Sequence, residues 1–134
     1  MIDVEVFGAE SLQDELLPAE VSRLCVHTAA RVGIEDGHVA VEFVEAARIA
    51  ELNAEHRGRA TPTDVLSFPI DGVEPTAGDG APRELGDIVI CPEHTVDLRE
   101  AVVHGMLHLL GMDHETDHGE MLELQCELLL EESR

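Results

Sequence analysis

The chain has 134 residues, of which 44% are hydrophobic and 28% charged, which is the length and composition of one soluble globular domain. It has 29 acidic residues against eight arginines and no lysine, and the formal net charge of −21 excludes a broad basic surface for polyanions. No apolar run approaches the roughly 18 residues of a membrane span, and the first residues alternate apolar with acidic side chains rather than forming a secretory signal. We therefore expect a cytoplasmic protein with no membrane partner.

Hydrophobic periodicity predicts alternating strands and helices along the chain. Segment 2–7 alternates with a period of two, as in a strand, and segment 18–32 has helical spacing between Pro18 and Gly33. The later strands are predicted over 39–43, 63–70 and 86–91, with a loop over 71–84. Helices are predicted over 46–55, 93–110 and 117–131. The last of these begins with a capping box formed by Asp117 and Glu120. This order predicts a single α+β domain over residues 1–134. We expect a small mixed sheet of about four strands, about four helices, and the histidine-rich helix at the centre.

Residue types that are rare in this chain limit its chemistry. Three cysteines, Cys25, Cys91 and Cys126, are an odd number in no paired spacing, which predicts reduced thiols packed as small hydrophobic residues rather than a disulfide framework. Tryptophan and tyrosine are absent and phenylalanine occurs three times, so the composition disfavours a base-stacking platform.

Three histidines, His104, His108 and His114, have the spacing of a metal site. Residues four apart on a helix project from one face, so His104 and His108 can hold one ion together. Gly111 can end the helix in a left-handed conformation and return the chain so that His114 becomes a third ligand. The surrounding apolar residues predict a buried helix, where unsatisfied imidazoles are costly. Three imidazoles with an open position are typical of catalytic zinc, and we predict one zinc ion per chain.

Other polar residues near this motif leave alternatives open. His118, Asp113 and Asp117 lie close enough to compete for the third ligand position, although solvent exposure or helix capping is the favoured interpretation. His94 can line the site. Asp87 or backbone carbonyls are expected to orient the ligand imidazoles.

The same spacing argues against a peptidase. It is the ligand spacing of the metzincin proteases, but Gly105 stands where those enzymes place a glutamate general base. Loss of such a proton shuttle costs about 10²–10⁴ in rate.

Four blocks of the sequence together resemble the YbeY family of bacterial endoribonucleases. They are Leu-Asn-Ala-Glu-His-Arg over 52–57, Thr-Asp-Val-Leu-Ser-Phe-Pro over 63–69, Leu-Gly-Asp-Ile-Val-Ile over 85–90, and the histidine run over 104–114. The resemblance extends from about Glu42 to Met121. It implies a zinc-dependent, single-strand-specific endoribonuclease of ribosomal RNA maturation and ribosome quality control. It also implies zinc ligands at His104, His108 and His114 and a functional arginine at Arg57.

The chain departs from the family pattern at three places. Family members usually have a tyrosine where His56 stands and an aromatic residue where Met112 stands. Their segment between the Gly-Asp-Ile block and the histidine helix is longer than 92–103 is here. The ligand spacing is unaffected by these differences.

Arginines near the predicted zinc are the expected contacts to RNA phosphate. Arg57 is the predicted catalytic residue, because a guanidinium stabilises charge that develops on phosphodiester oxygens. Arg59 and Ser67 are predicted to bind substrate, with Arg48 as a further phosphate contact, while Asp64 either positions substrate or caps a turn.

The acidic composition predicts weak affinity for free RNA and docking on the ribosome or on basic ribosomal proteins, with no DNA partner. Two other functions remain open: a metallohydrolase of other substrates, and a non-catalytic ribosome-assembly factor in which zinc only clamps helices.

Overall fold

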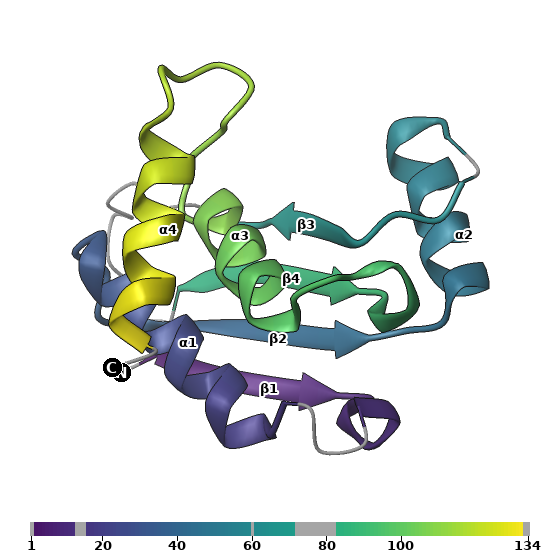
Figure 1. The fold of residues 1–134 in the computed structure, drawn as a ribbon, viewed down its shortest axis with the longest axis horizontal. Coiled ribbons are helices and arrows are strands. Elements are labelled where there is room, and N and C mark those ends of the chain that lie inside the picture. Colours follow the sequence, from purple (N-terminus) through teal and green to yellow (C-terminus); the bar gives the residue numbers. More distant parts are fainter. Residues whose placement is uncertain (1, 13–15, 60, 72–82, 133–134) are drawn as a thin grey trace.

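The computed structural model describes residues 2–12, 16–59, 61–71 and 83–132, so most of the predicted loop 71–84 lies outside the described residues. A mixed sheet has the strand order β1-β2-β4-β3, in which β1, β2 and β4 are parallel and β3 is antiparallel (Figure 1). The predicted α+β architecture is therefore confirmed. The elements are β1 (Ile2–Phe7), α1 (Pro18–Arg31), β2 (Gly37–Phe43), α2 (Ala46–Arg57), β3 (Val65–Pro69), β4 (Glu84–Ile90), α3 (Leu98–Leu109) and α4 (Glu120–Glu132), with short 3-10 turns at Ala9–Leu12 and Pro92–His94.

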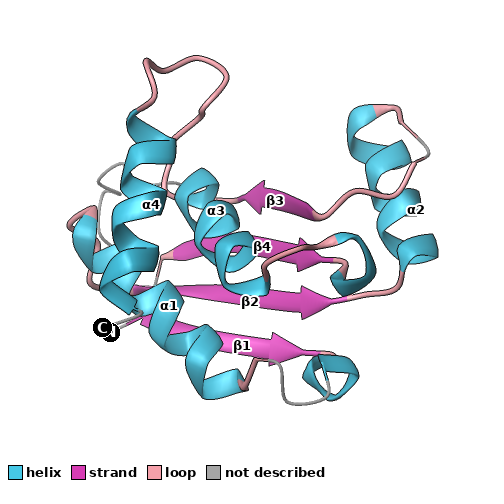
Figure 2. Cartoon of the chain, viewed as in Figure 1, coloured by secondary structure: helices cyan, strands magenta, loops and turns pink. Residues whose placement is uncertain are grey.

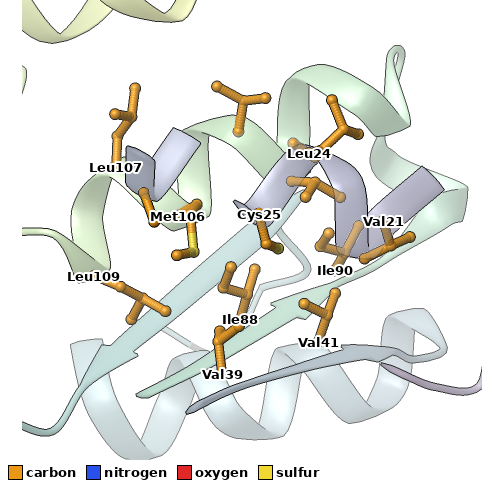
Figure 3. Close-up of a cluster of buried hydrophobic side chains, with 14 of the residues drawn as sticks. Val21, Leu24, Cys25, Val39, Val41, Ile88, Ile90, Met106, Leu107 and Leu109 are labelled. Atoms are coloured by element: carbon orange, nitrogen blue, oxygen red, sulfur yellow. The ribbon is translucent and has the colours of Figure 1, made fainter. Parts of the chain in front are cut away.

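The two faces of the sheet are covered unequally. Helices α1 and α3 pack on one face, here called the α3 face, and α4 packs against α3. Figure 3 shows the resulting core between sheet and helices, which includes Val41, Ile88 and Met106. The other face, here called the α2 face, carries a small separate cluster in which Ile49 of α2 packs with Leu66 and Val89. β3 forms one edge of the sheet, and a loop from α2 leads into it (Figure 2).

The histidine helix starts later than predicted. Helix α3 begins at Leu98 and not at residue 93, because the Asp97 carboxylate accepts hydrogen bonds from the backbone N–H groups of Arg99 and Glu100 at 3.0 and 3.3 Å. An aspartate in this position is a strong helix start. Among the described residues, no helix combines the length and the hydrophobicity needed to cross a bilayer.

The cysteine prediction holds for two of the three thiols. Cys25 and Cys91 are buried, and burial raises the pKa of Cys25 to about 12, which keeps that thiol protonated and unreactive. Cys126 is exposed, so its predicted burial is wrong. It lies between exposed Leu122 and Leu130 on the outer side of α4, at the spacing of one apolar helical stripe that the core does not cover.

Candidate metal centre

The three predicted histidines converge. His104 and His108 project from the last turns of α3, and Gly111, with φ of 93°, turns the chain back in the left-handed conformation so that His114 faces them. One nitrogen from each ring can be chosen so that all three lie within 4.8 Å of one another, and the His104 and His108 Nε2 atoms are 3.2 Å apart. Among the described residues this is the one group of three or more histidine, cysteine or acidic side chains close enough to hold a metal ion.

Hydrogen bonds on the outer ring nitrogens hold two of these rings in a metal-binding tautomer. His108 Nδ1 lies 3.0 Å from the Met112 carbonyl oxygen, which can only accept, so Nδ1 carries the proton and Nε2 presents its lone pair to the centre. His104 Nδ1 similarly donates to Gln125 Oε1 at 2.8 Å. Burial, with a further contribution from the nearby His104, lowers the pKa of His108 and favours its neutral form. Facing imidazole lone pairs with oriented rings are the donor set that zinc prefers, so these residues fit a zinc ion.

The groups that orient the rings were only partly predicted. A backbone carbonyl, that of Met112, serves as expected. The other alternative, Asp87, does not have this role, because it lies on the α2 face with Phe68 and Val89. Gln125 was missed: it is 21 residues from His104 and belongs to no motif. One signal was available, since Gln125 is a polar residue on the buried side of α4 between Met121 and Leu128.

A cavity of about 530 Å³ opens over the histidines. Arg57 reaches it from the last turn of α2, where Gly58 ends the helix with φ of 71°. An adjoining cavity of about 420 Å³ shares His104 and His114 with it and includes His94, which therefore lies beside the centre as the sequence suggested. The larger cavity is lined by Arg57, Thr63, Asp64, Val65, Ser67, Pro69, His104, His108, Gly111, Met112, Asp113, His114 and Glu115.

The remaining predicted residues are only partly gathered at this cavity. Ser67 lines it, and its hydroxyl donates to the Gly105 carbonyl at 3.1 Å. Arg59 is exposed just beyond the end of α2 and is not among the lining residues. Arg48 is not brought to the centre, because it pairs with Glu51 at 3.0 Å and lines cavities elsewhere.

The two aspartates near the histidine motif accept hydrogen bonds from nearby backbone N–H groups, which is the capping role that the sequence favoured. Asp117 caps the start of α4 by accepting from Gly119 and Met121 N–H groups at 2.8 and 2.9 Å, and these bonds lower the pKa of its carboxyl. Asp113 accepts from the Glu115 N–H at 3.0 Å.

Gly105 is a packing requirement of the centre. A Cβ atom at this position would lie 2.6 Å from Ile88 Cγ2 and 3.3 Å from Ser67 Oγ. Any larger side chain after His104 would therefore force either the Ile88 side chain or the helix backbone to shift. The close packing of α3 on β4 thus disfavours a glutamate at the position where the metzincin proteases carry their general base.

Comparison with known proteins places the whole arrangement in one family. The family model described as Endoribonuclease YbeY matches residues 8–132. The chain belongs to the YbeY family. The Endoribonuclease YbeY of Micrococcus luteus is 40% identical over 92% of this chain and 86% of its own, and that of Bacillus subtilis is 37% identical over 96% and 93%. The solution structure of TM1509 from Thermotoga maritima matches with a TM-score of 0.54 and 28% identity, over 94% of this chain and 86% of that one.

Proposed function

We propose that this YbeY-family chain is a zinc-dependent endoribonuclease that cleaves single-stranded RNA during ribosomal RNA maturation, acting as one unit over residues 1–134. The relatives named above are endoribonucleases. The observation that carries the proposal is that His104, His108 and His114 converge at one end of a cavity that also contains the exposed side chain of Arg57. Three neutral imidazoles leave a coordination position open, as catalytic zinc sites do.

The residues around the cavity divide into those that hold the metal and those that meet the substrate. His104, His108 and His114 would bind zinc, which supplies a Lewis acid that stabilises negative charge and makes water more acidic. The Arg57 guanidinium can donate two hydrogen bonds to non-bridging phosphate oxygens, whose charge grows as the linkage breaks. The Ser67 hydroxyl donates its hydrogen bond to the Gly105 carbonyl oxygen, so the Ser67 oxygen can accept a hydrogen bond from a ribose hydroxyl.

The acidic surface suggests how RNA reaches the site. With a net charge of −21, the protein repels free polyanions, whereas basic ribosomal proteins in the cytoplasm attract it. We infer that the ribosome presents the RNA, with Arg59 as a contact at the rim. The isolated protein should then bind free single strands more weakly than micromolar at 0.15 M salt, and submicromolar binding would contradict this inference.

Elemental analysis combined with an RNA cleavage assay tests the proposal. The wild-type protein should contain one zinc per chain and cut single-stranded RNA, and a chelator should stop the reaction. His108→Ala should lose both metal and cleavage, while His27→Ala, which changes a histidine far from the centre, should keep both. RNA cleavage by a metal-free protein would refute the zinc requirement. A zinc-loaded wild type that never cuts RNA but unfolds when zinc is removed would favour the structural-clamp function.

A further inference from the structure

A third cavity lies on the other side of the edge strand β3 from the metal centre. It has a volume of about 410 Å³ and opens on the α2 face. Neighbouring residues divide between the cavity of the metal centre and this one, because Arg57 and Ser67 line the former whereas His56 and Phe68 line the latter. Successive strand residues point to opposite faces, so only the thickness of β3 separates the cavities at this point. We call it the α2-face cavity; it is lined by Phe7, Ala40, Glu42, Arg48, Leu52, His56, Phe68, Asp87 and Val89.

Aromatic rings gather in this cavity although the chain has few of them. Two of its three phenylalanines, Phe7 and Phe68, line it. The Phe68 ring contacts the His56 ring with centroids 4.6 Å apart and the planes inclined at 56°. Phe7 is 49% exposed, which is unusual for so large an apolar side chain. Phe7 lies on β1, the edge strand opposite β3, whereas the half-buried Phe68 lies on β3, the strand that borders the metal centre, beside the exposed His56. Accessible rings of this kind are surfaces on which single-stranded bases stack.

Acidic side chains lie beside these rings in the sheet. The register places Asp87 of β4 opposite Phe68 of β3, and Glu42 of β2 opposite Phe7 of β1. Both carboxylates are exposed, and neither has a hydrogen-bond or ion-pair partner among the described residues. Free carboxylates next to a stacking surface can accept hydrogen bonds from the amino group of a base, as they do from cytosine N4.

We infer that the α2-face cavity binds a nucleobase next to the cleaved linkage, and that it selects a base with an exocyclic amino group. The inference rests on the proposed ribonuclease function. The base would stack on Phe68 and His56, Asp87 would accept from its amino group, and Arg48 would contact a flanking phosphate. Cytosine offers a donor where uracil offers a carbonyl oxygen, which a carboxylate repels, so cytosine is bound in preference to uracil.

Nucleosides test this site separately from RNA cleavage, because they have no phosphate for the metal centre to bind. Zinc-loaded protein is titrated with cytidine and with uridine, and the backbone amide signals are followed by NMR. Cytidine should give saturable shifts at His56, Phe68 and Asp87, with about tenfold weaker binding of uridine. Asp87→Asn should remove this preference. Glu55→Gln, which removes an exposed carboxylate on α2 outside the cavity, should leave it unchanged.

The outcomes separate this inference from the proposed function. Saturable, cytidine-selective shifts that Asp87→Asn abolishes would support the base site even if the protein failed to cut RNA. Absence of shifts at the cavity, or equal shifts with both nucleosides, would overturn the base site even if RNA were cleaved efficiently. In an active enzyme, Asp87→Asn should also raise KM about tenfold for RNAs cut beside cytosine and leave kcat and zinc content unchanged. An α2-face cavity that binds a basic peptide but neither nucleoside would assign the surface to a protein partner and refute the inference.

Discussion

The two faces of the sheet carry different parts of the proposed chemistry. On the α3 face, His104 and His108 belong to a helix whose other sides are buried in the main core. On the α2 face, a single helix covers a small cluster and leaves charged and aromatic side chains open to solvent. Close packing allows few positions to the histidine rings, while exposed side chains such as Arg57 keep rotamer freedom. The comparison indicates that the metal-binding groups are fixed in advance and that the RNA-contacting groups adjust to the substrate.

The largest expected effect concerns Arg57, which helix α2 supplies to the cavity of the metal centre, and it falls on catalysis alone. Arg57→Gln should lower kcat/KM for RNA cleavage by about 10²–10³-fold, the usual cost of losing one donor to developing charge. Zinc content and thermal midpoint should stay at wild-type values, because Arg57 is exposed and its side chain has no partner among the described residues. Arg59→Gln removes the same charge outside the cavity and should have a smaller effect. Equal losses of kcat/KM in both variants would mean that Arg57 only attracts RNA through its charge.

The same contrast explains what could be predicted from sequence. Periodicity and the histidine spacing are local signals, so they gave the elements, the α+β class and the convergence of His104, His108 and His114. Contacts between distant segments have no such signal, which is why Gln125 was missed and why Asp87, which lies on the α2 face, was kept as an alternative. Strand register decides the face on which Asp87 lies, and register follows from pairing across the sheet rather than from neighbouring residues.

On the α3 side, the clearest prediction concerns Gln125. Gln125→Leu cannot accept the proton of His104 Nδ1, so the ring loses its orientation and zinc affinity should fall about 10–100-fold. Gln125→Glu keeps an acceptor at the same place and should bind zinc at least as tightly as the wild type. Competition with a chromogenic chelator measures both. Equal zinc affinity in the leucine variant would show that core packing alone orients His104.

A smaller, purely structural effect is expected at Gly105. In a helix interior, alanine is favoured over glycine by about 1 kcal/mol, yet Gly105→Ala should destabilise the protein by about 1–3 kcal/mol because its methyl group would overlap Ile88. Urea unfolding measures the free energy of unfolding. In an Ile88→Ala background the substitution should cost less. The same cost in both backgrounds would show that the overlap with Ile88 does not cause the destabilisation.

The smallest effect, on the α2 face, depends on pH. His38 of β2 lies 2.6 Å from a Glu84 carboxylate oxygen and 2.7 Å from one of Glu5, and the bond to Glu84, with a further contribution from Glu5, raises the pKa of His38. Because the folded pKa lies above the unfolded value, this stabilisation is complete below the unfolded pKa and is lost as pH rises through the folded pKa. His38→Gln should therefore lower stability at pH 5.5 by about 1 kcal/mol or less, since solvent screens partly exposed pairs, and should change little at pH 8.5. Thermal melts at the two pH values measure the difference, and Glu84→Gln should reduce the same pH dependence. If His38→Gln lowered stability more at pH 8.5 than at pH 5.5, His38 would stabilise the fold through packing in its neutral form and not through its ion pairs. The α2 face would then be closer in character to the core than its exposure suggests.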